Sequence, residues 1–424
     1  MPNCPHTDHD DGEREIKGSY PLITYCRGGC DRTVFFCANP RCGEANRPLA
    51  HFCRRCGRKI SFDSSVADFL ASNDFSGKWA EARNYPLSQV KNVQALESYR
   101  GHLFVITSHK IIVYDLHRLS RPLKELPSPD GNVLRGITIL PAEKDERTGD
   151  EELFVATAKS LYRYSLLNLD APETLVFQLN DPNWDIHYQA LVCRGGLCLM
   201  TYNESERVSR LARHTGEVIK EFSGQSLPPL AIGGEAVFFG AEKQIFLYNG
   251  ETTIEGEVRE PLDREAQPAY SREVNQLYLV GRKALWRIDL QEGQLAAASL
   301  STTISGDARI AANEDHLFVA DADGFALLTP FGEKKWDSGQ SFIKASSDGY
   351  APQLDQRHVL FTAIGRFGGS EIRIHLRRDP KEFDEPVIFD KRLLCPPALS
   401  LGKLIAAVGD GNSASLELRQ AAQQ

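Results

Sequence analysis

A short apolar run recurs eight times along the chain, with 40 to 50 residues between successive starts. It reads Leu-Phe-Val-Ile at residues 103–106 and Leu-Phe-Val-Ala at residues 317–320. Self-similarity at such a period is the signature of a repeat architecture, in which each repeat is one unit that stacks against its neighbours. The runs are 103–106, 153–156, 197–200, 237–239, 277–280, 317–320, 359–361 and 404–407.

Each repeat has the content of four short strands. A second run with strand-like alternation follows the first, as at residues 111–115, 161–164, 245–248 and 285–289, and a weaker strand precedes it, as at 229–232 and 397–400. Turn dipeptides such as Asn249-Gly250 separate the units. Because helical periodicity is almost absent, the pattern predicts an all-β chain in which each repeat is one blade of a β-propeller.

Eight units predict an eight-bladed propeller over residues 76–424, or seven blades if the long second unit is irregular. The last unit, residues 397–419, has room for only three strands. Propellers close without a free edge when a strand from the other end of the chain completes the last sheet. We expect the segment Gly77–Tyr85, which contains Trp79, to supply that strand and to pair around Ser415–Leu418.

Several units resemble the propeller repeats of the pyrroloquinoline-quinone-like family. The resemblance is clearest at residues 317–324 and 331–336, and again at 277–293, which includes Trp286. It spans roughly residues 93–420 and implies a propeller fold, in a family that also contains non-enzymatic assembly scaffolds.

Six of the ten cysteines lie between Cys26 and Cys56. Four of them have the spacing Cys-x4-Cys-x10-Cys-x2-Cys, which places two pairs of thiolates in facing turns and suits the tetrahedral coordination of Zn²⁺. Disulfides or free thiols are the alternative. The predicted zinc ligands are Cys37, Cys42, Cys53 and Cys56.

The segment resembles the zinc-ribbon modules of bacterial multidomain proteins, whose second turn often reads Phe-Cys-x-x-Cys-Gly, as residues 52–57 do. The resemblance implies a structural zinc without catalysis. Cys26 and Cys30 form a further pair, and a second zinc would need two more ligands, such as Cys4 and His6. We therefore divide the chain into a flexible terminus (1–20), a zinc ribbon (21–60), a linker or short helix (61–75) and the propeller (76–424).

Charge separates the two modules. Residues 21–60 carry eight Lys or Arg against two acidic residues, a net +6, whereas residues 61–424 carry a net −11. The propeller is therefore a poor candidate for binding a phosphate backbone. The basic ribbon with Phe35, Phe36 and Phe52 could offer a nucleic-acid platform, although we expect these rings to fill the small core beneath the zinc.

Catalytic motifs are missing from the sequence: there is no phosphate-binding loop, no zinc-protease motif and no nucleophile elbow. The histidines at 102, 316 and 358 stand at the start of repeat runs, which predicts a structural role. Asp321 and Asp323 could bind calcium but read as a solvated turn. Cys193 and Cys198 flank a hairpin turn and are expected to be buried small hydrophobic residues, with a redox or metal role as the alternative.

The sequence thus predicts a non-enzymatic protein-interaction scaffold. We expect it to be cytoplasmic, because no signal peptide or membrane-spanning run is present, and the resemblance of its ribbon to modules of bacterial proteins implies a bacterial type. A nucleic-acid-associated protein and a quinoprotein-like propeller enzyme are the alternatives. The architecture resembles the propeller component of bacterial systems that include a MoxR-type ATPase and a von Willebrand A-type protein. That resemblance implies protein partners of these two classes. From the sequence itself we expect no membrane partner, and no small-molecule substrate is evident.

Overall fold

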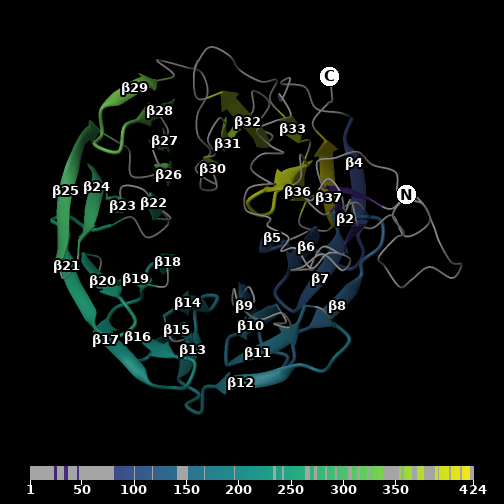
Figure 1. Cartoon of the computed structure of the whole chain (residues 1–424), viewed down its shortest axis with the longest axis horizontal. Coiled ribbons are helices and arrows are strands. Elements are labelled where there is room, and N and C mark those ends of the chain that lie inside the picture. Colours follow the sequence, from purple (N-terminus) through teal and green to yellow (C-terminus); the bar gives the residue numbers. More distant parts are fainter. Residues whose placement is uncertain are drawn as a thin grey trace, which may run out of the picture.

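The chain folds, in a computed structural model, into antiparallel sheets whose strands follow one another in sequence (Figure 1). Within the described residues, all regular secondary structure is β-strand, which confirms the predicted all-β class. The structure describes residues 23–25, 33–36, 45–46, 81–99, 101–116, 118–140, 151–166, 168–194, 196–232, 235–240, 243–262, 268–271, 275–281, 284–291, 294–303, 308–312, 316–321, 324–337, 353–354, 358–364, 370–376, 387–389, 391–400, 403–410 and 413–420.

These residues form eight sheets of four or five strands and one of three strands. The first four large sheets contain β5 (Ala95–Tyr99), β6 (His102–Ile106), β7 (Lys110–Asp115) and β8 (Lys124–Pro127); β9 (Leu134–Leu140), β10 (Glu152–Thr157), β11 (Ser160–Ser165) and β12 (Thr174–Gln178); β13 (Trp184–Ile186), β14 (Leu191–Cys193), β15 (Gly196–Asn203), β16 (Val208–Arg213) and β17 (Val218–Ser223); and β18 (Leu230–Ile232), β19 (Glu235–Gly240), β20 (Gln244–Tyr248) and β21 (Thr253–Glu257).

The other four contain β22 (Ala269–Ser271), β23 (Gln276–Val280), β24 (Ala284–Gln291) and β25 (Gln294–Thr303); β26 (Arg309–Ala312), β27 (Leu317–Asp321), β28 (Gly324–Leu328) and β29 (Lys334–Asp337); β30 (Gln353–Leu354), β31 (His358–Ile364), β32 (Ser370–Leu376) and β33 (Val387–Phe389); and β34 (Arg392–Leu393), β35 (Ala398–Ser400), β36 (Lys403–Gly409), β37 (Ala414–Gln420) and β4 (Arg83–Leu87).

The recurring apolar run occupies an equivalent place in every large sheet. All eight runs fall in the strand next to the innermost one, from β6 in the first sheet to β36 in the last. This strand has a neighbouring strand on each side and lies between packed sheets, and the side chains of the run are buried in the seven sheets where their burial is described. That is why the run is continuously apolar and does not alternate with polar residues.

The core is divided among the spaces between neighbouring sheets. On β6, Leu103 and Val105 pack toward the sheet of β36 and β37, whereas Phe104 and Ile106 pack toward the sheet of β9 and β10. Successive side chains of a strand point to opposite faces, so a single run contributes to two cores. The same division recurs on β10.

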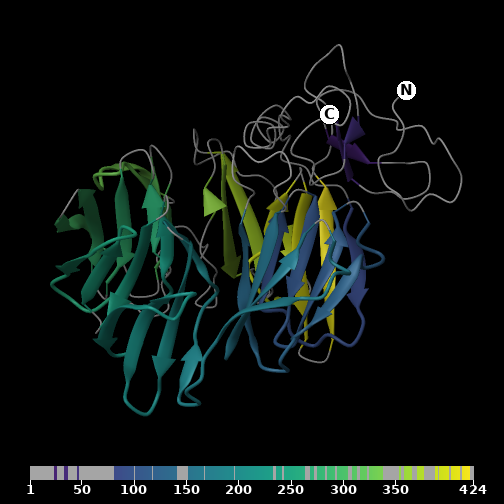
Figure 2. The same ribbon diagram turned by 60° about the horizontal axis from the view of Figure 1, so that its bottom comes forward.

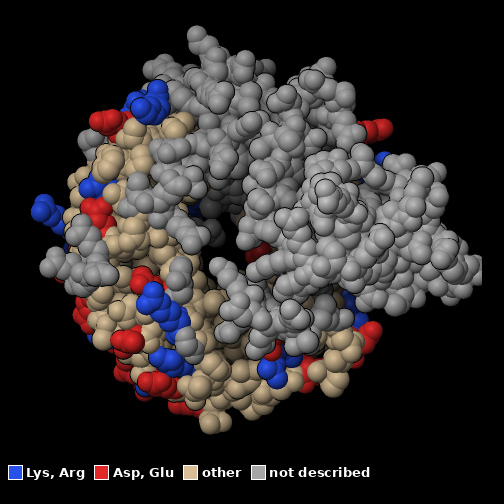
Figure 3. All heavy atoms as spheres, in the orientation of Figure 1, with Lys and Arg blue, Asp and Glu red and all other residues tan. Residues whose placement is uncertain are grey.

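The sheets stand around a central space, with β5, β9, β14, β18, β22, β26 and β30 nearest to it and strands such as β8, β12, β17 and β25 at the periphery (Figure 1). Figure 2 shows strands running between two ends of the ring, where the loops collect. Figure 3 shows that the surface is hollowed at the centre. Sheets arranged in this way form a β-propeller.

The ring is closed as predicted, by a strand that precedes the first repeat. β4 pairs antiparallel with β37, and the register places Tyr85 opposite Leu416 and Arg83 opposite Leu418. The strand runs over Arg83–Leu87, so it begins later than the predicted Gly77–Tyr85. Trp79 lies outside the described residues.

The three-stranded sheet lies within the predicted ribbon segment. It contains β1 (Ile23–Tyr25), β2 (Thr33–Phe36) and β3 (Ala45–Asn46), in the order β1-β2-β3. The predicted flexible terminus (1–20) and the linker (61–75) lie outside the described residues.

Candidate interaction surface

At one end of the ring, three neighbouring sheets are joined through their loops. The amide of Leu134 donates to the carbonyl of Ser108 (2.8 Å), and the amide of Ala158 donates to that of Val133 (2.8 Å). The amide of Ile186 then donates to the carbonyl of Ala158 (2.8 Å). The first and third bonds join the start of one sheet to the turn between the second and third strands of the preceding sheet, and in both the start of the sheet donates. In the second bond, the turn between β10 and β11 donates to the start of its own sheet. The loops at this end are therefore fixed to the frame of the ring.

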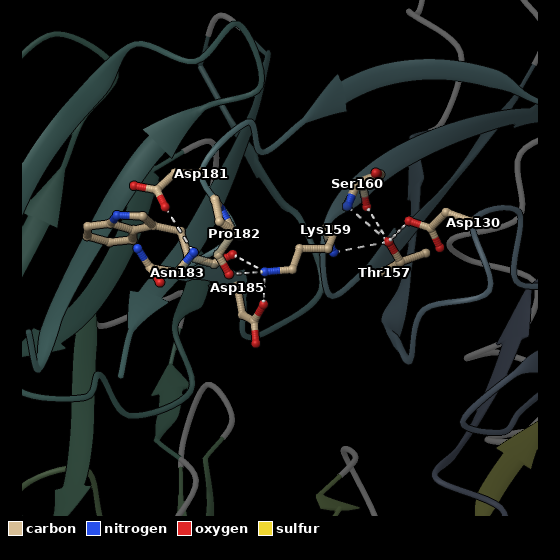
Figure 4. A network of polar contacts seen from close by, with 9 residues as sticks. Asp130, Thr157, Lys159, Ser160, Asp181, Pro182, Asn183 and Asp185 are labelled. Atoms are coloured by element: carbon tan, nitrogen blue, oxygen red, sulfur yellow. Dashed lines mark hydrogen bonds and ion pairs between the residues drawn. The ribbon is translucent and has the colours of Figure 1, made fainter. Parts of the chain in front are cut away.

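Asp130 anchors the loop between β8 and β9. Its carboxylate accepts hydrogen bonds from the Asn132 amide (3.0 Å) and the Ser128 hydroxyl (3.2 Å), and from the Thr157 hydroxyl of the next sheet (2.8 Å; Figure 4). Burial raises the pKa of Asp130, but hydrogen bonds from Asn132 and Thr157 outweigh it, so the pKa lies below its ordinary value. The carboxylate is therefore ionised at neutral pH.

Lys159, in the β10–β11 turn, makes the next link. Its ammonium group donates to the carbonyls of Pro182 and Trp184 (both 2.8 Å) and forms an ion pair with Asp185 (2.6 Å; Figure 4). The guanidinium of Arg210 lies 3.8 Å from the centroid of the Trp184 ring. These contacts fix the β12–β13 connection. The charged groups of Lys159 and Asp185 are engaged in them, so we assign these residues to positioning the loop rather than to acid–base chemistry.

Apolar and uncharged side chains are exposed around this network. Val133 is 38% exposed, and Pro182 and Asn183 are also exposed, next to the exposed carboxylate of Asp181. We define the network surface as Ser128–Val133, Ala158, Lys159 and Leu179–Asp185.

A backbone detail holds the adjoining inner strands together. Both β13 and β14 pair with β15, and residues 187–190 lie between them. Gly136 on β9 has a φ of +146°, and a Cβ there would lie 2.8 Å from Cβ of Gln189. Glycine at 136 thus permits the close approach of these two sheets.

His187 lies in the segment between β13 and β14. Burial and then the charge of Arg135 lower the pKa of His187, against opposing effects of Asp185 and Glu204.

The predicted zinc ligands Cys37, Cys42, Cys53 and Cys56 lie outside the described residues, as do Cys4, His6, Cys26 and Cys30. The described residues include no group of three or more potential His, Cys, Asp or Glu ligands that could hold a metal ion. Within the same residues, no helix has the length and hydropathy to cross a membrane.

The remaining candidates fall where the repeat places them. His102 and His358 are the first residues of β6 and β31, and His316 directly precedes β27, as expected of residues at the start of strands. Asp321 is the last residue of β27 and is paired with Gly324, whereas Asp323 is not described. The predicted Cys193–Cys198 hairpin is confirmed, and both cysteines are buried.

The network residues Asp130, Thr157 and Lys159 were not predicted from the sequence. A signal was nevertheless present: threonine follows the apolar run at positions 107, 157 and 201. Thr107 and Thr157 both accept hydrogen bonds in the tight turn from the amides two and three residues ahead. At positions 107 and 157 the threonine therefore marks a turn at this end of the ring, whereas Thr201 lies within β15, opposite Arg210.

No protein-family model matches the chain, and no curated protein matches it in sequence. It is similar to the solved structures of BamB from Moraxella catarrhalis (13% identity, TM-score 0.53, covering 81% of this chain and 100% of BamB) and of the computationally designed Ika8 protein (10% identity, TM-score 0.55, covering 78% and 98%). The WD40 domain of SCAP from fission yeast also matches (10% identity, TM-score 0.46, covering 80% and 98%). At these identities the first two show the fold alone, a β-propeller.

Proposed function

We propose that this chain is a non-enzymatic scaffold that binds other proteins through the network surface. The observation that carries the proposal is the combination of fixed loops and exposed, uncharged side chains at one end of the propeller. Asp130 and Lys159 tie the connections before β9 and β13 to the neighbouring turns, while Val133, Pro182 and Asn183 remain exposed. Fixed loops lose little conformational entropy on binding, which favours recognition of a folded partner.

We further propose that each of the eight large sheets is one blade, and that residues 21–60 form a zinc ribbon. The blade number is supported by the eight repeats and by the closing pair of β4 and β37. The ribbon is supported by the small sheet β1–β3 and by a donor set of four cysteines, which suits Zn²⁺. The metal would stabilise the ribbon and supply no chemistry.

The partners we propose are proteins, including an ATPase and a von Willebrand A-type protein, and the location we propose is the cytoplasm. The charge difference between the ribbon (+6) and the rest of the chain (−11) supports separate binding surfaces for different partners. Binding to nucleic acid is the alternative for the basic ribbon. It would appear as affinity for DNA or RNA that falls steeply with salt.

The test compares two valines in pull-downs with the full chain. Val133 lies on the network surface, whereas Val218 is 50% exposed on the outer strand β17 and serves as the matched control. We expect Val133→Asp to lose specific protein partners and Val218→Asp to retain them, with both variants as stable as the parent. Equal recovery by the two variants would contradict the network surface, and turnover or a bound cofactor would contradict the non-enzymatic role.

A further inference from the structure

Two cysteines lie together away from the network surface. Cys193 ends β14 and Cys198 lies in β15, and the register pairs Cys193 with Gly196 and Leu191 with Cys198. The cysteines therefore occupy diagonal positions on one face of the hairpin, in the same apolar cluster. They are 6% and 2% exposed.

The Cys193 thiol donates a hydrogen bond to the Leu191 carbonyl oxygen, with 3.8 Å between the sulfur and the oxygen. The neighbouring Cys198 thiol and then burial raise the pKa of Cys193. The Cys193 thiol lowers the pKa of Cys198, where burial opposes it and the charge of Arg213 assists. We therefore expect Cys198 to ionise before Cys193.

Arg213 is fixed beside this pair. It lies directly opposite Cys198 in the pairing of β15 with β16. Its guanidinium donates to the Tyr248 hydroxyl (2.6 Å) and the Gly250 carbonyl (2.8 Å), and it forms an ion pair with Glu217 (3.2 Å). A fixed cation next to a sulfur favours the thiolate, which is the reactive form of cysteine.

The pair lies next to the hairpin turn between β14 and β15. Arg194, which directly follows Cys193, is exposed, and Gly196 has a φ of +130°. The imidazole of His214 packs against this turn, where its Nδ1 lies 3.3 Å from the Leu197 amide nitrogen. We expect a small oxidant to reach the buried pair by displacing this turn.

We propose that Cys193 and Cys198 form an oxidation site for hydroperoxides. The Cys198 thiolate attacks the peroxide, an S–O bond forms as the O–O bond breaks, and the leaving oxygen takes a proton to become water or an alcohol. The Cys193 sulfur then attacks the Cys198 sulfenic acid. An S–S bond forms, and the S–O bond breaks. The Cys193 proton leaves with the hydroxyl as water, so two electrons have passed from the thiols to the peroxide.

Cys395 provides an internal control in the same chain. It is buried, and burial followed by the charge of Glu97 raises its pKa to about 12. Cys395 is therefore as buried as Cys193 and Cys198, but its pKa is raised, whereas that of Cys198 is lowered. Reactivity that followed burial alone would be equal at all three cysteines.

The experiment treats the full, reduced chain with hydrogen peroxide and follows each cysteine by differential alkylation and peptide mass spectrometry. We expect a Cys193–Cys198 disulfide that dithiothreitol reverses, while Cys395 remains reduced. In Cys193→Ser we expect Cys198 to stop as a sulfenic acid, and in Cys198→Ser we expect Cys193 to stay reduced. Arg213→Gln should slow the reaction about 3–10-fold, and Arg213→Lys should restore part of the rate.

Oxidation of Cys193 and Cys198 no faster than that of Cys395, or of Cys193 before Cys198, would overturn the proposal. The comparison with Cys395 is made in the unaltered chain, so it holds even if a variant fails to fold. Circular dichroism and the melting temperature monitor the fold of each variant. Partner binding is not part of the readout, so the result is independent of the scaffold function.

Discussion

Tyr85 in β4 lies directly opposite Leu416 in β37, so the start and the end of the propeller share one sheet. Leu416 is buried in the core between this sheet and that of β5–β8, and Tyr85 packs against the same core. The contact therefore joins the two ends of the ring through side chains as well as through the backbone.

We predict that deleting residues 1–60 leaves the stability of the propeller unchanged, whereas deleting residues 1–88 lowers it. The longer deletion removes all of β4, which exposes the edge of β37 and part of a core. Differential scanning calorimetry of the two truncated chains provides the measurement. We also expect the longer deletion to aggregate at lower concentrations, as seen by light scattering. Equal melting temperatures would show that β4 does not close the ring.

The elements that the sequence predicted best are those whose residues are buried on both faces. The run at Leu103–Ile106 could be recognised because every position faces one of two cores, so its apolar character repeats in each unit. Closure could be predicted from the missing fourth strand of the last unit. The exact start of β4 could not, since an outer strand with one free edge carries a weaker pattern.

The network surface was not predicted because its contacts join residues that are far apart in the chain and chemically ordinary. Asp130 and Thr157 are 27 residues apart, and neither belongs to a motif. Lys159 has no distinguishing sequence context, and its role becomes apparent only from its contacts with the β12–β13 connection. Such pairing depends on how neighbouring sheets are positioned, which a repeat period does not specify.

We predict that Asp130→Asn lowers the free energy of unfolding at pH 7 by about 1–3 kcal/mol, because an ionised acceptor of three hydrogen bonds is replaced by a neutral amide. The measurement is urea unfolding. Asp170→Asn, which removes an exposed ion pair with Lys124, is the control and should change the free energy by less than about 0.5 kcal/mol.

The same variant tests the pH dependence. Because the folded pKa of Asp130 lies below its ordinary value of 3.8, its contribution is fully present above that pH and is lost as the pH falls through the folded pKa. The difference between parent and Asp130→Asn should therefore shrink below about pH 4. A difference that stays constant down to pH 2.5 would exclude an ionised Asp130 as its cause.

We predict that Gly136→Ala destabilises the chain more than Gly131→Ala does. A Cβ at 136 would lie 2.8 Å from Cβ of Gln189, whereas at 131, with a φ of +72°, it would meet nothing within 4 Å. The first substitution combines strain with overpacking and should cost about 2–4 kcal/mol, and the second about 1–2 kcal/mol from strain alone. Urea unfolding measures both, and adding Gln189→Gly should recover part of the first loss. Equal losses of unfolding free energy for the two substitutions would mean that the sheets can move apart near residue 136 to accommodate the added methyl group.

The last prediction concerns zinc. If Cys37, Cys42, Cys53 and Cys56 hold it, the chain purified without chelators should contain about one zinc ion, or about two if Cys26 and Cys30 contribute to a second site. Cys53→Ser should reduce the content by about one and unfold the ribbon, because metal binding supplies most of the folding free energy of so small a module. Cys395→Ser is the matched control, because this cysteine belongs to the core of the ring.

The propeller should survive the loss of zinc. Its described cores lie between its own sheets. Calorimetry of Cys53→Ser should therefore retain the main unfolding transition at the temperature of the parent, while the zinc-dependent signal is lost. A parent chain without zinc would refute the ribbon. A main transition that falls together with the zinc content would refute the independence of the two modules, since it would require the ribbon to stabilise the ring.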